Sequence, residues 1–245
     1  MLRGIFSICK KELQDYFYSL IAYVFLILFV LISNIFFFTS GGIFKEDNAT
    51  MRLFFTFLPY VFVAFIPGLT MGIWSKEKNL GTIELLFTLP VSQIQVLIGK
   101  FFASLAVIMI ALLSSLSIPV FTSILLGSFD WGQIFTQYLG AILIASCYIA
   151  ITFFFSSLTK EVINSFLLSL FVLLILNIMG LLAGSVQFYP WLEWVKVVLN
   201  NISLSSHFSN FSKGVIDSRD LFYYLGVIVI FFYFTQRSLE SKRWS

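Results

Sequence analysis

Two acidic residues near the C-terminal end have a spacing that could support chemistry. Asp217 and Asp220 are three residues apart, so on a helix they share one face, with Arg219 between them. Two carboxylates on one face can serve acid–base catalysis or hold a cation. No histidine or third ligand follows them at a useful spacing. Acidic residues also suit the first turn of a helix, where the helix dipole favours negative charge, and this is the stronger interpretation.

The other reactive side chains form no catalytic or metal pattern. Cys9 and Cys147 lie in different regions without C-x-x-C spacing and are predicted to be small apolar fillers. His207, the single histidine, is interpreted as a surface or interface residue. No Ser/His or Asp/Asp pair lies within an apolar run, which argues against an intramembrane enzyme. Since the G-x-x-x-x-G-K-[ST] motif is absent too, we predict no catalytic, cofactor-binding or metal-binding residues.

The composition indicates which kind of fold must position these residues. Of 245 residues, 59% are hydrophobic and 11% are charged, against about 45–50% and about 25% in soluble domains. A soluble fold of this size needs more charge to cover its surface. The composition therefore excludes a soluble enzyme, a disordered chain and a conventional nucleic-acid binder, and it predicts a polytopic membrane protein. The net charge of +3 is attributed to loops at the membrane, with no nucleic-acid partner.

Charge-free runs give the expected spans. Five runs hold between 23 and 31 residues, enough for a span of about 20 residues. A sixth, at 221–236, holds 16 and needs flanking residues, such as a snorkelling Arg237, to cross the bilayer. We predict an all-α integral membrane protein with six transmembrane helices, at residues 20–40, 53–74, 97–126, 136–157, 163–184 and 220–237.

The basic residues predict the orientation. Ten of the fifteen Lys and Arg residues fall on one side of these spans, the side of both termini. That side is expected to face the cytoplasm. Lys100 is counted with this side, and the first five spans are taken to hold no ionisable side chain. Such spans argue against a proton-coupled secondary transporter.

The first nineteen residues are predicted to form an amphipathic helix. At 100° per residue, the apolar side chains fall within an arc of about 120°. They are Ile5, Phe6, Cys9, Leu13, Tyr16, Phe17 and Leu20. The preferred interpretation is a helix lying at the membrane interface before span 1. The alternative is a cytoplasmic extension of that span.

The loop after span 2 carries the most specific pattern. Lys76, Glu77 and Lys78 are expected to end the span in water, and Thr82–Thr88 can form about two helical turns with an apolar side. Pro90 stops that helix, and Ser92-x-x-Gln95 fits a capping box that starts span 3. Such a short helix could dock into a groove on a soluble partner. It could equally be a hairpin loop resting on the lipid headgroups.

The spacing in this loop resembles that of ABC-2 type transporter permeases. The matching residues are Glu77, Gly81, Thr82, Glu84, Leu85, Leu86, Thr88, Pro90 and Ser92, followed by Gly99-Lys100. In that family the short helix is the coupling helix, which seats in the ATP-binding subunit. The resemblance implies that Glu77 and Glu84 anchor the loop, that Leu85, Leu86 and Phe87 dock, and that Gly81–Ser92 transmits closure of the ATPase.

Three further segments are similar to the permease subfamily typified by the gliding-motility-associated ABC permease. They are Ser156–Thr159, Ser212–Tyr224 and Leu239–Trp244. This resemblance implies an exporter of two permease copies, or this chain and a homologue, with two ATP-binding subunits. ATP and Mg²⁺ would bind the partner chains, in a bacterial inner membrane, and this chain would hold no cofactor. Membrane lipids are the other expected partners.

The outer loop before span 6 is rich in aromatic residues. Phe188–Asn200 could form an amphipathic helix, and Tyr189, Trp191 and Trp194 favour the membrane interface. In the resembling family this region forms short extracytoplasmic helices near the exit of the pathway. Together with Asp217 and Asp220, these aromatic residues would form an outer gate that contacts an amphiphilic substrate. Membrane anchoring alone is the slightly favoured alternative.

The chain is expected to be one permease domain over residues 1–245. Its segments are the interfacial helix at 1–19, spans 1 and 2 at 20–74, the coupling loop at 75–96, spans 3 to 5 at 97–184, the outer helices at 185–219, and span 6 with the tail at 220–245. The alternative hypothesis is an ATPase-independent membrane carrier, or a scaffold protein of a cell-surface machine.

Overall fold

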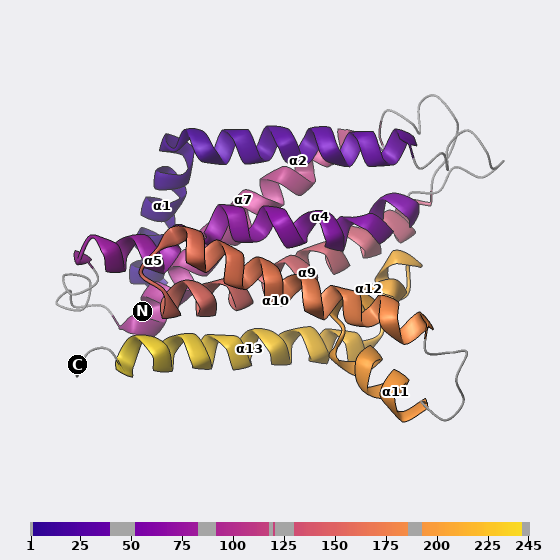
Figure 1. Ribbon diagram of the computed structural model, residues 1–245. Coiled ribbons are helices and arrows are strands. Elements are labelled where there is room, and N and C mark those ends of the chain that lie inside the picture. Colours follow the sequence, from indigo (N-terminus) through magenta and orange to yellow (C-terminus); the bar gives the residue numbers. More distant parts are fainter. Residues whose placement is uncertain are drawn as a thin grey trace.

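The computed structural model describes residues 2–39, 52–82, 92–117, 120, 130–185 and 193–241. Within these ranges the chain is helical and has no strand, which confirms the all-α class. Long helices run side by side and short helices close both ends of the bundle (Figure 1). The long elements are α2 (Leu20–Thr39), α4 (Arg52–Thr70) continued by α5 (Gly72–Asn79), α7 (Gln93–Ser115), α9 (Trp131–Leu158), α10 (Val162–Ser185) and α13 (Ser218–Ser241).

The lengths of these helices fit a multi-pass membrane protein. Five helical elements are long and apolar enough to cross a membrane, and the bent pair of α1 (Leu2–Tyr18) and α2 makes up to a sixth. The start of α1, the end of α5 and the end of α13 lie at the same end of the bundle, and α11 (Glu193–Ile202) and α12 (Leu204–Ser212) lie at the other (Figure 1). The predicted end of span 3 at residue 126 lies outside the described residues, and the other helix ends lie within five residues of the predicted ones. Caps such as Asp130 extend the helices: its carboxylate accepts from the N–H groups of Gly132 and Gln133.

Helix α1 (Leu2–Tyr18) is a separate element rather than a straight extension of α2. The two helices meet at Ser19 with a bend of 75°, so α1 crosses the end of the bundle (Figure 1). It packs against α7 at Gly99, where an added Cβ would lie 2.8 Å from the Cγ2 atom of Ile8. Phe6, which belongs to the predicted apolar arc, is 71% exposed because α7 covers only one edge of that arc. The position of α1 at a membrane interface stays a prediction.

The second span continues further than the sequence indicates. After a turn at Met71, α5 continues the helix to Asn79, so Lys76, Glu77 and Lys78 lie on a helix rather than in the loop. Lys76 is exposed and the helix ends one residue after Lys78, so the prediction that these charges end the span in water stays a prediction. Glu77 is partly buried against Lys100, and contacts from a distant helix support the extra two turns.

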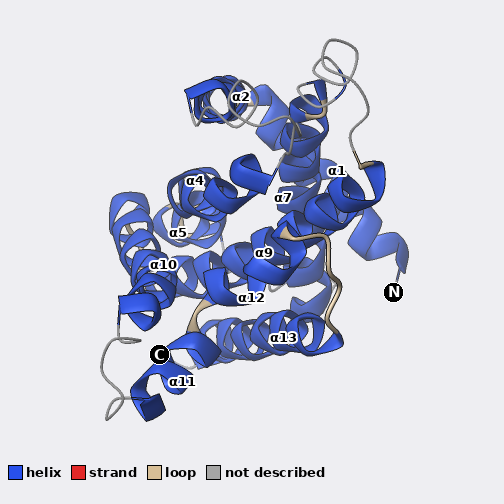
Figure 2. Cartoon of the chain, turned by 90° about the vertical axis from the view of Figure 1, so that its right-hand side faces the viewer, coloured by secondary structure: helices blue, strands red, loops and turns tan. Residues whose placement is uncertain are grey.

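Helix α9 forms the centre of the bundle. Figure 2 shows it surrounded by α4, α7, α10 and α13, with α12 (Leu204–Ser212) also close to it. Its residues from Ile144 to Phe153 are almost completely buried. The hydroxyl of Tyr148 donates to the side-chain oxygen of Asn177 on α10 at 2.7 Å. A central helix that is apolar on all sides explains why its sequence shows almost no amphipathic pattern.

Lys100 contradicts the prediction that the first five spans contain no ionisable residue. It lies two turns into α7 and is 1% exposed. Lys100 falls within the predicted span at 97–126, directly before the charge-free run that starts at Phe101, where a lysine would ordinarily reach water. Here α1 covers the end of α7, so the ammonium group is enclosed and must find partners within the protein.

Candidate functional site

The candidate site is the base of the loop that joins α5 to α7. On the α5 side, the N–H of Leu80 donates to the carbonyl of Lys76 at 3.0 Å, and Gly81 adopts a φ of +69°. Glycine adopts this left-handed conformation without the strain that a Cβ would bring. On the α7 side, Ser92 and Gln95 form the predicted capping box with bonds of 3.0 and 3.3 Å. Both ends of the loop are therefore fixed by local hydrogen bonds.

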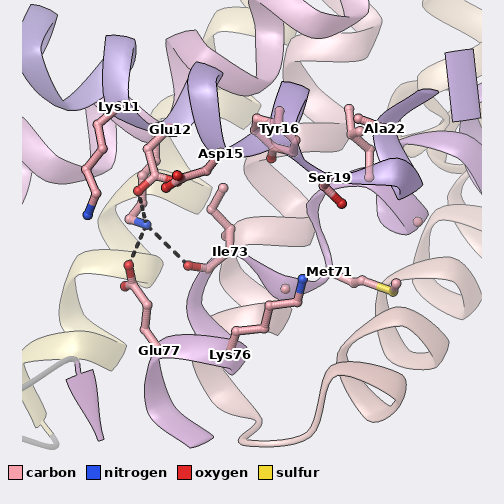
Figure 3. A pocket seen from close by; sticks show the side chains of 14 residues that line it. Lys11, Glu12, Asp15, Tyr16, Ser19, Ala22, Met71, Ile73, Lys76 and Glu77 are labelled. Atoms are coloured by element: carbon pink, nitrogen blue, oxygen red, sulfur yellow. Dashed lines mark hydrogen bonds and ion pairs between the residues drawn. The ribbon is translucent and has the colours of Figure 1, made fainter. Parts of the chain in front are cut away.

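A buried ion triad joins the first of these ends to α1. The ammonium of Lys100 lies 2.7 Å from Glu12 Oε1 on α1 and 2.7 Å from Glu77 Oε1 on α5. It also lies 3.5 Å from the carbonyl of Ile73 and 5.2 Å from the centre of the Trp74 ring. Figure 3 shows the dashed contacts that converge on this ammonium from both helices. Three elements that enter this end of the bundle are thus held at one point.

The triad makes the arrangement of these elements selective. A lysine buried to this degree loses its hydration, and two carboxylates at hydrogen-bonding distance compensate for that loss. An arrangement that moved α1 or α5 away would leave a charge buried without its partner, which costs several kcal/mol. Displacements of α5, which continues into the loop, are therefore coupled to α1 and α7.

A second contact between α1 and α7 lies one turn further along. The Tyr16 phenol and the Ser104 hydroxyl are 2.9 Å apart. Because Ser104 donates its own proton to the Lys100 carbonyl at 3.0 Å, the phenol is the donor. Burial is the main cause that raises the pKa of Tyr16, so this donor stays protonated at any physiological pH.

Ser156 on α9 supports the turn between α4 and α5. Its hydroxyl accepts from the N–H groups of Trp74 and Ser75 at 3.1 and 3.2 Å, and it donates to the Met71 carbonyl at 2.8 Å. These N–H groups belong to the first turn of α5, where a helix lacks internal acceptors. One buried side chain thus bonds two N–H groups at the start of α5, and it shares the Met71 carbonyl with the Ser75 hydroxyl, which donates to it at 2.7 Å.

Replacing Ser156 with alanine should destabilise the protein by about 1–3 kcal/mol, because the buried N–H groups of Trp74 and Ser75 lose the hydroxyl that they donate to. Ser157→Ala is the matched control. The Ser157 hydroxyl bonds only within its own helix, to the Phe154 carbonyl at 2.7 Å, so the expected change is below about 0.5 kcal/mol. Thermal unfolding of the detergent-solubilised protein measures both. Equal effects of the two substitutions would contradict this role of Ser156.

The structure describes only part of the predicted coupling segment. Glu77, Gly81, Thr82 and Ser92 flank the loop, and the Thr82 hydroxyl donates to the Glu77 carbonyl at 3.3 Å. The other residues of this prediction lie outside the described residues: Glu84, Leu85, Leu86, Phe87, Thr88 and Pro90. The ion pairs that Lys100 forms with Glu12 and with Glu77 were not expected. Their only sequence signals were a charge at position 12 of an amphipathic helix and a lysine at the start of a span.

At the opposite end of the bundle, Asp220 lies within a polar cluster. Its Oδ1 atom is 2.6 Å from His207 Nδ1, and its Oδ2 atom accepts from Asn210 at 2.8 Å. The His207 ring stacks on Tyr223 with the ring centres 3.9 Å apart. His207 is 19% exposed, so the interpretation as a surface or interface residue is not contradicted, but the sequence did not indicate that a residue preceding the acidic pair folds back to it.

The helix-start interpretation of the acidic pair is confirmed. Asp217 precedes α13 and accepts from the Arg219 N–H at 2.9 Å, and Asp220 lies in the first turn. Over the described residues, no group of three or more His, Cys, Asp or Glu side chains could hold a metal ion. Trp194 is 69% exposed on α11 (Glu193–Ile202), while Tyr189 and Trp191 lie outside the described residues. The role of these residues as an outer gate stays a prediction.

The family model described as ABC-2 family transporter protein matches residues 6–244, nearly the whole chain. No curated protein matches the chain.

Proposed function

The chain belongs to the ABC-2 family of transporter proteins, and on this premise we propose that it is the permease of an ATP-driven exporter. Membership makes it a multi-pass membrane component of an ABC transporter, whose partner is an ATP-binding subunit. The proposal adds that this subunit docks on the loop between α5 and α7, and that the loop end of the bundle faces the cytoplasm. The observation that carries the proposal is the family match over residues 6–244.

The ion triad supports a coupling role for this loop. A loop that transmits closure of an ATPase must be rigidly connected to the membrane-spanning helices. Glu77 lies two residues before the end of α5. It pairs with Lys100, and Lys100 also pairs with Glu12. A force on the loop therefore acts on α1, α5 and α7 together. The capping box at Ser92 fixes the other end.

We further propose that the pathway forms between two permease copies. Among the described helices, α10 and α13 keep long apolar faces exposed: only 22% and 17% of the residues in their most apolar stretches are buried. Such faces are suited to contact with a second copy, a homologue or lipid. The similarity of Ser156–Thr159, Ser212–Tyr224 and Leu239–Trp244 to the gliding-motility-type permeases supports that subfamily and a bacterial inner-membrane location.

Copurification tests the proposal. The chain is expressed with the ATP-binding chain encoded beside it, solubilised, and purified through a tag on the permease. We expect a complex of two permease and two ATP-binding chains that hydrolyses ATP. A permease that purifies without nucleotide hydrolysis, with no P-loop protein encoded nearby, would contradict the proposal and favour the carrier or scaffold hypothesis.

A further inference from the structure

A cavity of about 220 Å³ lies between α1 and the junction of α4 with α5. Figure 3 shows its lining, with side chains from α1 on one side and from α5 on the other. The triad of Glu12, Glu77 and Lys100 forms one wall. The cavity thus lies where α1 crosses the end of the bundle, and the predicted interfacial position of α1 puts it at the level of the lipid headgroups.

Three other charged residues line this cavity without a partner of their own. Lys11 and Asp15 on α1 and Lys76 on α5 are exposed. Among the residues that the structure describes, none of these three forms an ion pair. These three side chains carry a net formal charge of one positive, and the triad carries a net formal charge of one negative. The site as a whole is neutral, with separated positive and negative groups.

An apolar groove adjoins the cavity. This shallow groove runs between α2, α4 and α7, and Leu69 lines both the groove and the cavity. Ala22 and Gly68 of the cavity lie one helical turn from Phe25 and Phe65 of the groove. Phenyl rings and aliphatic side chains form its walls. A polar cavity joined to an apolar groove has the form of an amphiphile, because one part suits a headgroup and the other a hydrocarbon chain.

We propose that this site binds one phospholipid with a zwitterionic aminoethyl headgroup, of the phosphatidylethanolamine class. The lipid phosphate lies between Lys11 and Lys76, the primary ammonium donates to Asp15, and one acyl chain follows the groove past Leu69. A neutral site with separated charges matches a zwitterion. An anionic headgroup without an ammonium would leave Asp15 and the net charge of the triad uncompensated.

The bound lipid connects α1 to α5. Its phosphate contacts a lysine from each helix beside the triad, so it stabilises the same contact as the ion pairs do. This lipid site is independent of the ATPase partner.

Native mass spectrometry with matched variants tests the site. The purified full chain is incubated with equal amounts of phosphatidylethanolamine, phosphatidylcholine and phosphatidylglycerol that carry the same acyl chains. We expect wild type to retain phosphatidylethanolamine about tenfold better than either other lipid, the factor that one charge-assisted hydrogen bond supplies. Asp15→Asn should abolish this preference, and Lys11→Gln with Lys76→Gln should reduce retention of all three lipids. Lys10→Gln, on an exposed neighbour that does not line the cavity, is the control and should behave as wild type.

Other outcomes would overturn the proposal. Equal retention of the three lipids by wild type would show that the site does not select an ammonium group. The same preference in wild type and Asp15→Asn would place the lipid elsewhere. Glycerophosphoethanolamine, which has the headgroup without acyl chains, should not compete at the same concentration. If it competes as well as the intact lipid, the groove plays no part and the proposal fails.

Discussion

Replacing Lys100 with methionine is expected to destabilise the protein by about 3 kcal/mol. Removing one partner of a buried ion pair typically costs 3–5 kcal/mol, because the remaining charge stays buried. We expect the lower end of this range of destabilisation, because the side chains of Glu12 and Glu77 are 14% and 21% exposed and can partly rehydrate. Methionine retains most of the packing of the lysine stem. Denaturation in detergent, followed by the helical circular dichroism signal, measures the change in the free energy of unfolding.

Two controls separate charge from packing at this position. Lys10→Met makes the same change on the exposed side of α1 and should alter stability by less than about 0.5 kcal/mol. Combining Lys100→Met with Glu12→Gln and Glu77→Gln removes the stranded charges and should restore most of the loss. If the triple variant is less stable than Lys100→Met alone, packing rather than charge pairing explains the effect.

Replacing Leu86 with aspartate is expected to weaken association with the ATP-binding subunit by at least about tenfold. The prediction rests on the resemblance of the loop to a coupling helix, in which this apolar side chain docks. Burial of one leucine contributes about 1.5–3 kcal/mol, and each 1.4 kcal/mol is tenfold in affinity. A charged replacement adds the cost of burying a carboxylate in the partner's groove.

The matched control is Ile216→Asp. Ile216 is 53% exposed before α13, at the opposite end of the bundle, so the same chemical change there should leave association unchanged. Binding of the purified subunit to permease in nanodiscs gives both affinities. Equal affinities of wild type and Leu86→Asp would contradict the assignment of the loop.

The spans could be predicted from the sequence because the bilayer acts on each segment separately. A charge-free run of sufficient length is enough to predict a helix such as α10, whatever it packs against. The capping box at Ser92 was equally predictable, since both of its partners lie within four residues. Separation of α1 from α2 followed from the change of the apolar pattern near Ser19.

The contacts that define the site could not be predicted in the same way. Glu12 and Lys100 are 88 residues apart in the chain, and nothing local to either position indicates a partner. The extension of α5 depends on Ser156, which is 82 residues from Trp74. The pairing of His207 with Asp220 needs α12 to fold back on α13, which a lone histidine does not signal. Each of these interactions is a product of packing between helices.

The rate of ATP hydrolysis by the reconstituted complex tests the central claim most directly. The ATP-binding subunit is measured in vesicles with the wild-type permease, with Leu86→Asp and with Ile216→Asp. The account predicts that wild type and Ile216→Asp support the same rate, and that Leu86→Asp falls to the rate of the subunit alone. A rate with Leu86→Asp equal to that of wild type would contradict coupling through this loop.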